Sequence, residues 1–219
     1  MTSIIELGAA DLAALLCSRV CHDLINPVGA IGNGLEVLAD PSQKEMADFA
    51  RELIENSAKQ ARAKLEFARL AFGASSTAGT EIDTREAERV SSLLMECEKA
   101  DLDWKVAPML LPKNKAKLML NMLLITVGGV PRGGTVSVEV TGEAGHEAIT
   151  LTATGPKTLI PNAVPGLLAG TPEEGNVDAR GIQPFYTGVL ARLSNMGINI
   201  ALEDDKLRFT ADPLPTTVD

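Results

Sequence analysis

Apolar residues follow helical spacing over the first part of the chain, and this pattern restricts the possible folds more than any other feature. They recur at alternating steps of four and three, at Leu12, Leu16, Val20, Leu24, Val28, Ile31, Leu35 and Leu38. The spacing predicts one amphipathic helix over residues 9–38. Asp40-Pro41 ends it, and Ser42-Gln43-Lys44-Glu45 has the form of a capping box that starts a second helix, which continues to about Phe72.

The two predicted helices are joined by so short a connection that they must lie antiparallel. A hairpin of two helices cannot bury a long apolar face by itself. Either the rest of the same chain covers this face, or a second copy of the chain supplies two more helices by symmetry. We expect the second arrangement, a homodimer that forms a four-helix bundle.

His22 lies two residues from both Val20 and Leu24, so a helix points it away from the apolar stripe and toward water. A carboxylate, Asp23, stands beside it. Pro27 follows inside the stripe, where a proline costs about 3 kcal/mol. Asn26-Pro27 either ends one helix and begins the next, or kinks a continuous helix. The stripe passes Pro27 without a change of phase, which favours the kink.

The segment from His22 to Val28, His-Asp-Leu-Ile-Asn-Pro-Val, resembles the H-box of two-component histidine kinases. Over nearly its whole length the chain resembles the ChpT family of histidine phosphotransferases more closely. The segments that carry this resemblance are residues 15–23, 71–74, 111–115, 131–134 and 183–186.

This resemblance implies a phosphotransferase of a multistep phosphorelay. His22 would accept a phosphoryl group from a phospho-aspartate on the receiver domain of a hybrid histidine kinase. It would then pass the group to the aspartate of a response regulator that controls the cell cycle. The resemblance also implies that Mg²⁺ comes with the partner's receiver domain, so we expect this chain to bind no cofactor and no metal.

Small residues from Ser75 to Thr80 indicate a linker. We therefore divide the chain into a phosphotransfer and dimerisation hairpin (residues 1–74), a linker (75–84) and a second domain (85–219). In the second part we expect helices over residues 84–100, 113–130 and 181–196, strands over 102–107, 135–141, 148–153, 199–203 and 206–210, and a short helix or loop over 161–168. Helices against one mostly antiparallel sheet form an α/β sandwich, so the fold class is α+β.

By resemblance this second part is a degenerate histidine-kinase ATP-binding domain. Ile125 stands where kinases carry the asparagine that holds Mg²⁺, and Ala153 replaces the aspartate that recognises adenine. Lys157 replaces a glycine of the same motif, and Pro184 stands in the glycine-rich lid. A hard cation needs oxygen ligands, which these side chains lack. We therefore expect no use of ATP.

Other residues are candidates for contact with the phosphoryl group or with a receiver domain. Arg19 and Asn26 lie three residues before and four residues after His22, on its helix face. If the hairpin turns at Asp40-Pro41, Lys59 and Arg62 lie near the level of His22. For each of these four the alternative is an ordinary solvated side chain, or for Asn26 a cap at the kink. Asp23 either orients the imidazole and serves as its base, or is simply solvated.

The composition of the chain limits the functions and the cellular locations that remain. The net charge of −9 argues against a general nucleic-acid binder. No secretion signal and no membrane-spanning run is evident, so we expect a cytoplasmic protein with reduced cysteines. Cys17 and Cys21 near His22 lack a fourth metal ligand, and we expect His146 to lie on the surface.

Two competing hypotheses are a non-catalytic dimeric scaffold that binds receiver domains and an ATP-dependent histidine kinase.

Overall fold

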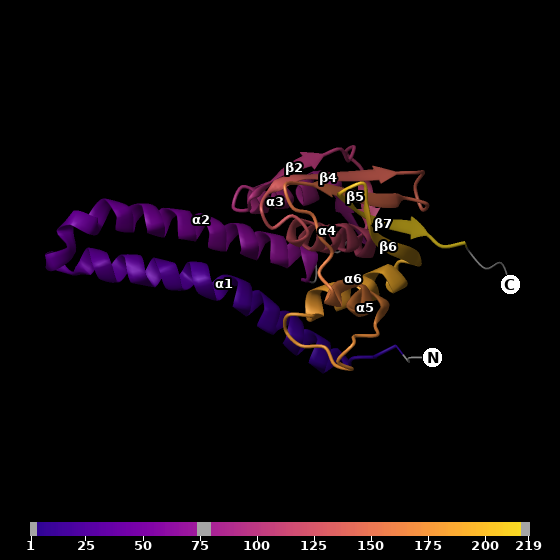
Figure 1. Cartoon of the computed structure of the whole chain (residues 1–219), viewed down its shortest axis with the longest axis horizontal. Coiled ribbons are helices and arrows are strands. Elements are labelled where there is room, and N and C mark those ends of the chain that lie inside the picture. Colours follow the sequence, from indigo (N-terminus) through magenta and orange to yellow (C-terminus); the bar gives the residue numbers. More distant parts are fainter. Residues whose placement is uncertain (1–3, 74–79, 216–219) are drawn as a thin grey trace.

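A computed structural model describes residues 4–73 and 80–215. Two long helices, α1 (Ala9–Ala39) and α2 (Ala47–Ala71), form an antiparallel hairpin that extends away from a compact second part (Figure 1). Helix α1 is continuous through Pro27, so the prediction of a single helix is confirmed and the alternative of two helices is not. Figure 1 shows that the N-terminal part of α1 runs at an angle to the rest of the helix.

The connection between the helices differs from the predicted capping box. Residues Pro41–Met46 form a 3-10 helix, η1, which precedes α2. Asp40, not Ser42, is the capping residue, and its carboxylate accepts hydrogen bonds from the backbone N–H and hydroxyl of Ser42 and from the amide of Gln43. Proline at the next position fits this arrangement because it has no N–H to donate.

Pro27 and Gly34 are the buried residues of α1, and they mark the face that packs on α2. A Cβ atom on Gly34 would lie 2.7 Å from the side chain of Ile54 and 3.1 Å from the carbonyl oxygen of Ala50. Glycine therefore allows the two helices to approach closely at this level. The apolar stripe is wider than this contact face, and part of it remains exposed.

The second part contains a five-stranded sheet with the order β2-β4-β5-β7-β6. Only the β2–β4 pair is parallel among the described strands. The strands are β2 (Ala100–Trp104), β4 (Gly134–Thr141), β5 (Ala148–Thr154), β6 (Met196–Glu203) and β7 (Lys206–Pro213). Two further strands, β1 (Glu81–Asp83) and β3 (Leu110–Pro112), pair separately.

Helices cover the side of the sheet that faces the hairpin (Figure 1). They are α3 (Thr84–Met95), α4 (Lys113–Gly128), α5 (Ala163–Ala169) and α6 (Ile182–Leu193). Helix α4 is buried nearly all round and lies at the centre of the aliphatic core. The expected α+β class, with long helices followed by a sheet domain, is confirmed.

Some predicted boundaries were wrong. The helix expected over residues 84–100 ends at Met95, and the strand expected over 102–107 is β2. Strands β1 and β3 were not predicted, because each is only three residues long and lacks a repeating pattern. Strand β1 falls within the expected linker, of which residues 75–79 lie outside the described part. No helix among the described residues is long and apolar enough to cross a membrane.

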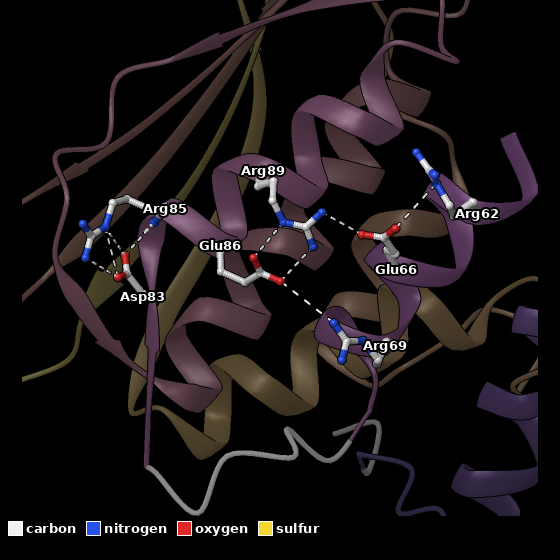
Figure 2. A network of polar contacts seen from close by, with 7 residues as sticks. All are labelled: Arg62, Glu66, Arg69, Asp83, Arg85, Glu86 and Arg89. Atoms are coloured by element: carbon white, nitrogen blue, oxygen red, sulfur yellow. Dashed lines mark hydrogen bonds and ion pairs between the residues drawn. The ribbon is translucent and has the colours of Figure 1, made fainter. Parts of the chain in front are cut away.

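A chain of ion pairs joins the hairpin to α3 (Figure 2). Glu66 of α2 contacts Arg62 at 3.7 Å and Arg89 of α3 at 2.7 Å. Arg89 also contacts Glu86 at 2.8 Å, and Glu86 in turn lies 4.0 Å from Arg69 of α2. The pairs form a network at the surface that connects α2 to α3.

Candidate functional site

His22 is exposed on α1, as the helical phase predicted, and 65% of its side-chain surface is accessible. Its Nδ1 atom lies 3.4 Å from Oδ1 of Asp23. Its Nε2 atom has no hydrogen-bond partner among the described residues. A proton on Nδ1 would face the carboxylate, and this tautomer leaves a lone pair on Nε2. The site therefore presents one free, nucleophilic nitrogen to a partner molecule.

Arg19 holds Asp23 in place. Its Nε atom donates to Oδ2 of Asp23 over 2.9 Å, so one carboxylate oxygen meets the guanidinium and the other meets the imidazole. The three residues lie within about one helical turn, which explains why a continuous α1 brings them together. Asn26, one turn farther along, is exposed, and its side chain makes no hydrogen bond with any described residue.

Lys64 of α2 was not found by sequence reasoning. Its ammonium group donates to the backbone carbonyl of Asp23 over 3.4 Å. A turn centred on Asp40-Pro41 predicts that the level of His22 on α2 is near Lys59. The 3-10 helix η1 moves the centre of the hairpin toward residue 43, so a residue about five positions later lies opposite the histidine.

Lys59 and Arg62 both lie on α2 with carboxylate partners. Lys59 contacts Glu96 at 2.7 Å, and this hydrogen bond raises the pKa of the lysine. Arg62 contacts Glu66 at 3.7 Å and remains mostly exposed. Neither contacts His22 or Asp23. Both remain accessible to a partner that docks on the hairpin.

Two of the positions that by resemblance belong to nucleotide-binding motifs lie in a packed interior, whereas Lys157 is exposed. Ile125 and Ala153 are buried in the core. Gln183 is also buried, and its amide donates to the backbone carbonyl of Asn121 over 2.8 Å and to the hydroxyl of Thr187 over 3.3 Å. Helix α6 runs through Pro184 without a flexible lid. Ile125, Ala153 and Pro184 offer no oxygen-bearing side chain for a metal, and the amide of Gln183 is already hydrogen-bonded.

Asn121 connects this interior to the hairpin. Its amide donates to the carbonyl of Ala71, the last residue of α2, over 3.1 Å, and to the carbonyl of Lys117 over 2.9 Å. Asn121 therefore serves as a structural link between α4 and the end of α2.

No group of three His, Cys, Asp or Glu side chains within the described residues could hold a metal ion. Cys17 and Cys21 are free thiols on the surface of α1. His146 is exposed in the loop between β4 and β5, as expected. Beside it, Glu147 is buried and contacts Lys115 of α4 at 2.6 Å.

An apolar face remains exposed along the hairpin. Ile25, Val28 and Leu35 of α1 have 68%, 56% and 54% of their surface accessible, and Phe49 and Leu65 of α2 have 59% and 54%. The three residues of α1 lie on one side of that helix, and exposed apolar residues grouped in this way are typical of a surface that meets another protein.

Comparisons with known proteins identify the family of the chain. The family model described as histidine phosphotransferase C-terminal domain matches residues 84–206. Protein phosphotransferase ChpT of Brucella abortus (strain 2308) is 43% identical over 212 residues, which cover 97% of this chain and 100% of that protein. The chain belongs to the histidine phosphotransferase family.

A solved structure agrees in fold over nearly the whole length. It is described as the 1.7 Angstrom structure of a bacterial phosphotransferase, and it superposes with a TM-score of 0.89 at 43% identity. The superposition covers 96% of this chain and 100% of that one. The predicted resemblance to the ChpT family is thus confirmed. Membership of this histidine phosphotransferase family makes phosphotransfer in two-component signalling the activity of the chain.

Proposed function

We propose that this histidine phosphotransferase is the relay component between two receiver domains, with His22 as the phosphoacceptor. The observation that carries the proposal is the pairing at His22: Nδ1 faces Asp23, and Nε2 is unpartnered among the described residues on an exposed helix face. A phosphoryl donor can approach such a nitrogen without any rearrangement of the core.

The transfer step follows from this geometry. The Nε2 lone pair attacks the phosphorus of a phospho-aspartate on the receiver, an N–P bond forms, and the O–P bond to the aspartate breaks. The carboxylate that leaves stays on the receiver. The imidazole ring gains positive charge, which Asp23 stabilises through the Nδ1 proton. Transfer to a second receiver is the same step in reverse.

Charge neutralisation at the phosphoryl group is shared with the partner. Phosphoryl transfer depends mainly on positioning and on electrostatic stabilisation. We propose that Mg²⁺ is held by the receiver domain, that this chain binds no metal or nucleotide, and that Arg19 contributes positive charge next to the histidine. Lys59, Arg62 and Asn26 are proposed to contact the receiver, since all three are exposed on the hairpin.

We further propose that the active species is a homodimer in the cytoplasm. The exposed apolar face of the hairpin supports a four-helix bundle of two chains. Three free cysteines, of which Cys17 and Cys21 are exposed, fit a reducing compartment. In this arrangement residues 1–74 carry the phosphotransfer and dimerisation functions, residues 75–84 join the two parts, and residues 85–219 form the degenerate ATPase-like domain.

The direct experiment incubates the chain with a receiver domain phosphorylated by acetyl phosphate. Phosphate that is labile in acid and stable in base should appear on His22, located by mass spectrometry of peptides. A second, dephosphorylated receiver should then remove it. A non-catalytic scaffold would bind the receivers but acquire no phosphate.

A further inference from the structure

A small cavity lies where α1, α2 and the second part of the chain meet. Its volume is about 110 Å³. Most of its wall is apolar and comes from the side chains of Val20, Leu24, Phe67, Ala68, Phe72, Leu94 and Leu124. Four charged residues also line it: Arg19 and Asp23 of α1, Lys64 of α2, and Glu98, which follows α3. The cavity therefore adjoins the residue next to the phosphoacceptor.

Two of these four charges are already matched. Arg19 pairs with Asp23 at 2.9 Å, whereas Lys64 has only a long contact, 3.4 Å, with a backbone carbonyl. No ion pair within 4.0 Å involves Lys64 or Glu98 among the described residues. Lys64 is partly buried, whereas Glu98 lines the cavity but is exposed, and neither has an ion-pair partner within the described part of the chain that neutralises its charge.

Glu98 responds to this environment. Burial raises the pKa of its carboxyl group, the positive charge of Lys64 opposes that rise, and the negative charge of Asp23 adds to it. Lys64 and Asp23 thus both act electrostatically on Glu98, which comes from a different part of the chain. Arg19 is the remaining charged residue that lines the cavity, and His22 reaches this group of charges through its contact with Asp23.

We propose that Lys64 and Glu98 form a charge-compensating pair for the phosphohistidine, in which Lys64 stabilises the phosphoryl group on His22 and Glu98 limits that stabilisation. This inference rests on the proposed function. Without phosphate the four charges of the cavity sum to zero. A phosphoryl group adds between about −1.5 and −2 near Asp23. Lys64 supplies the attraction that this added charge requires, and Glu98 repels it.

The consequence is a role for the second part of the chain that does not involve ATP. The second part of the chain places the carboxylate of Glu98 beside Lys64. In this way it sets the equilibrium partition of the phosphoryl group between His22 and the receiver aspartate. Both residues are positioning residues in this account. They act on the phosphoryl group through the field in the cavity, and neither needs to contact the receiver.

The test measures the equilibrium partition of phosphate between the full-length chain and a phosphorylated receiver domain. Lys64→Met should lower the phosphohistidine fraction about tenfold, the effect of losing one charged partner. Lys64→Arg should restore it, because charge rather than shape is required. Glu98→Gln should raise it roughly threefold, as expected for a screened ion pair. Lys44→Met and Glu88→Gln, exposed residues outside the cavity, are matched controls and should leave the partition unchanged.

Affinity for the receiver and the melting temperature are measured for each variant. The inference is overturned if the partition is unchanged in Lys64→Met and Glu98→Gln while the unaltered chain transfers phosphate normally. It is also overturned if the whole deficit of Lys64→Met lies in receiver affinity, or if Lys64→Arg fails to restore the partition although it folds. Absence of any transfer by the unaltered chain would instead refute the proposed function, and this inference with it.

Discussion

The side-chain amide of Gln183 donates a hydrogen bond of 2.8 Å to the backbone carbonyl of Asn121, and so joins α6 to α4 inside the second part of the molecule. Both side chains are buried. Asn121 lies four residues before Ile125, and Gln183 directly precedes Pro184, and both of those positions resemble nucleotide-binding motifs of histidine kinases. In this chain the two side-chain amides hydrogen-bond to each other, and the amide of Asn121 also donates to the carbonyl of Ala71 at the end of α2. These segments therefore contribute to packing of the interior.

We therefore predict that the chain does not bind ATP. Ile125 cannot coordinate Mg²⁺, Ala153 cannot recognise adenine, and the Gln183–Asn121 contact occupies the space between α4 and α6. Titration calorimetry with Mg-ATP should give no heat of binding, and an ATP-competent histidine kinase domain is the positive control. A micromolar site would contradict this account of the domain.

The exposed apolar face of the hairpin predicts a dimer. A single charged substitution on this face should dissociate it. In a four-helix bundle Leu35→Glu buries an unpaired carboxylate, which is costly. Because 54% of Leu35 is accessible in the single chain, the variant should remain folded as a monomer. Sedimentation velocity measures the oligomeric state of the variant. Leu193→Glu, at an exposed position on α6, is the matched control. An unchanged Leu35→Glu dimer would place the interface elsewhere.

The buried ion pair between Lys115 and Glu147 predicts a large loss of stability when it is broken. The side chains are 9% and 2% exposed, and Lys115 also donates to the carbonyl of Gly145 over 3.2 Å. Glu147→Gln leaves the ammonium group of Lys115 without its counter-charge. This loss should lower the free energy of unfolding by about 3–5 kcal/mol. Urea unfolding measures the loss. Substitution of Glu143, exposed in the same loop, should have little effect.

The same pair predicts a dependence of stability on pH. Burial by itself would raise the pKa of Glu147, but the hydrogen bonds from Lys115 and from the N–H of Gly145 outweigh it and lower the pKa below the ordinary 4.5. A carboxyl group with a lowered folded-state pKa stabilises the fold above its unfolded-state pKa, and this contribution is lost as pH falls through the folded-state pKa. The stability difference between the unaltered chain and Glu147→Gln should therefore shrink as pH drops below about 4.5. A constant difference would mean that the pKa of Glu147 is the same in the folded and unfolded states.

The contact between Arg19 and Asp23 predicts graded effects on transfer. Asp23→Asn keeps the shape but removes the charge that stabilises the imidazole ring, so transfer should slow by about 10²-fold, within the usual range for an acid–base group. Arg19→Ala should have a smaller effect, because it leaves Asp23 in place but less well oriented. Single-turnover rates at saturating receiver separate these effects from binding. Equal rates for all three proteins would remove Asp23 from the mechanism.

The exposure of His22 followed from the sequence because it depends only on the phase of one regular helix. The same holds for the continuous helix through Pro27, where the apolar stripe kept its register. The position of Lys64 opposite Asp23 could not be predicted, since it depends on how many residues the turn consumes, and η1 consumes six. Glu98 joins the cavity only through packing of α3 against α2, which no local pattern encodes.

The direct test of the central claim is phosphotransfer by His22→Ala, measured together with thermal melting and dimerisation. The side chain is 65% exposed, so its removal should change the unfolding free energy by no more than about 0.5 kcal/mol. We predict that transfer from a phosphorylated receiver is abolished, while Tm, the dimer and receiver binding stay unchanged. Full transfer by this variant would contradict the assignment of His22 as the phosphoacceptor.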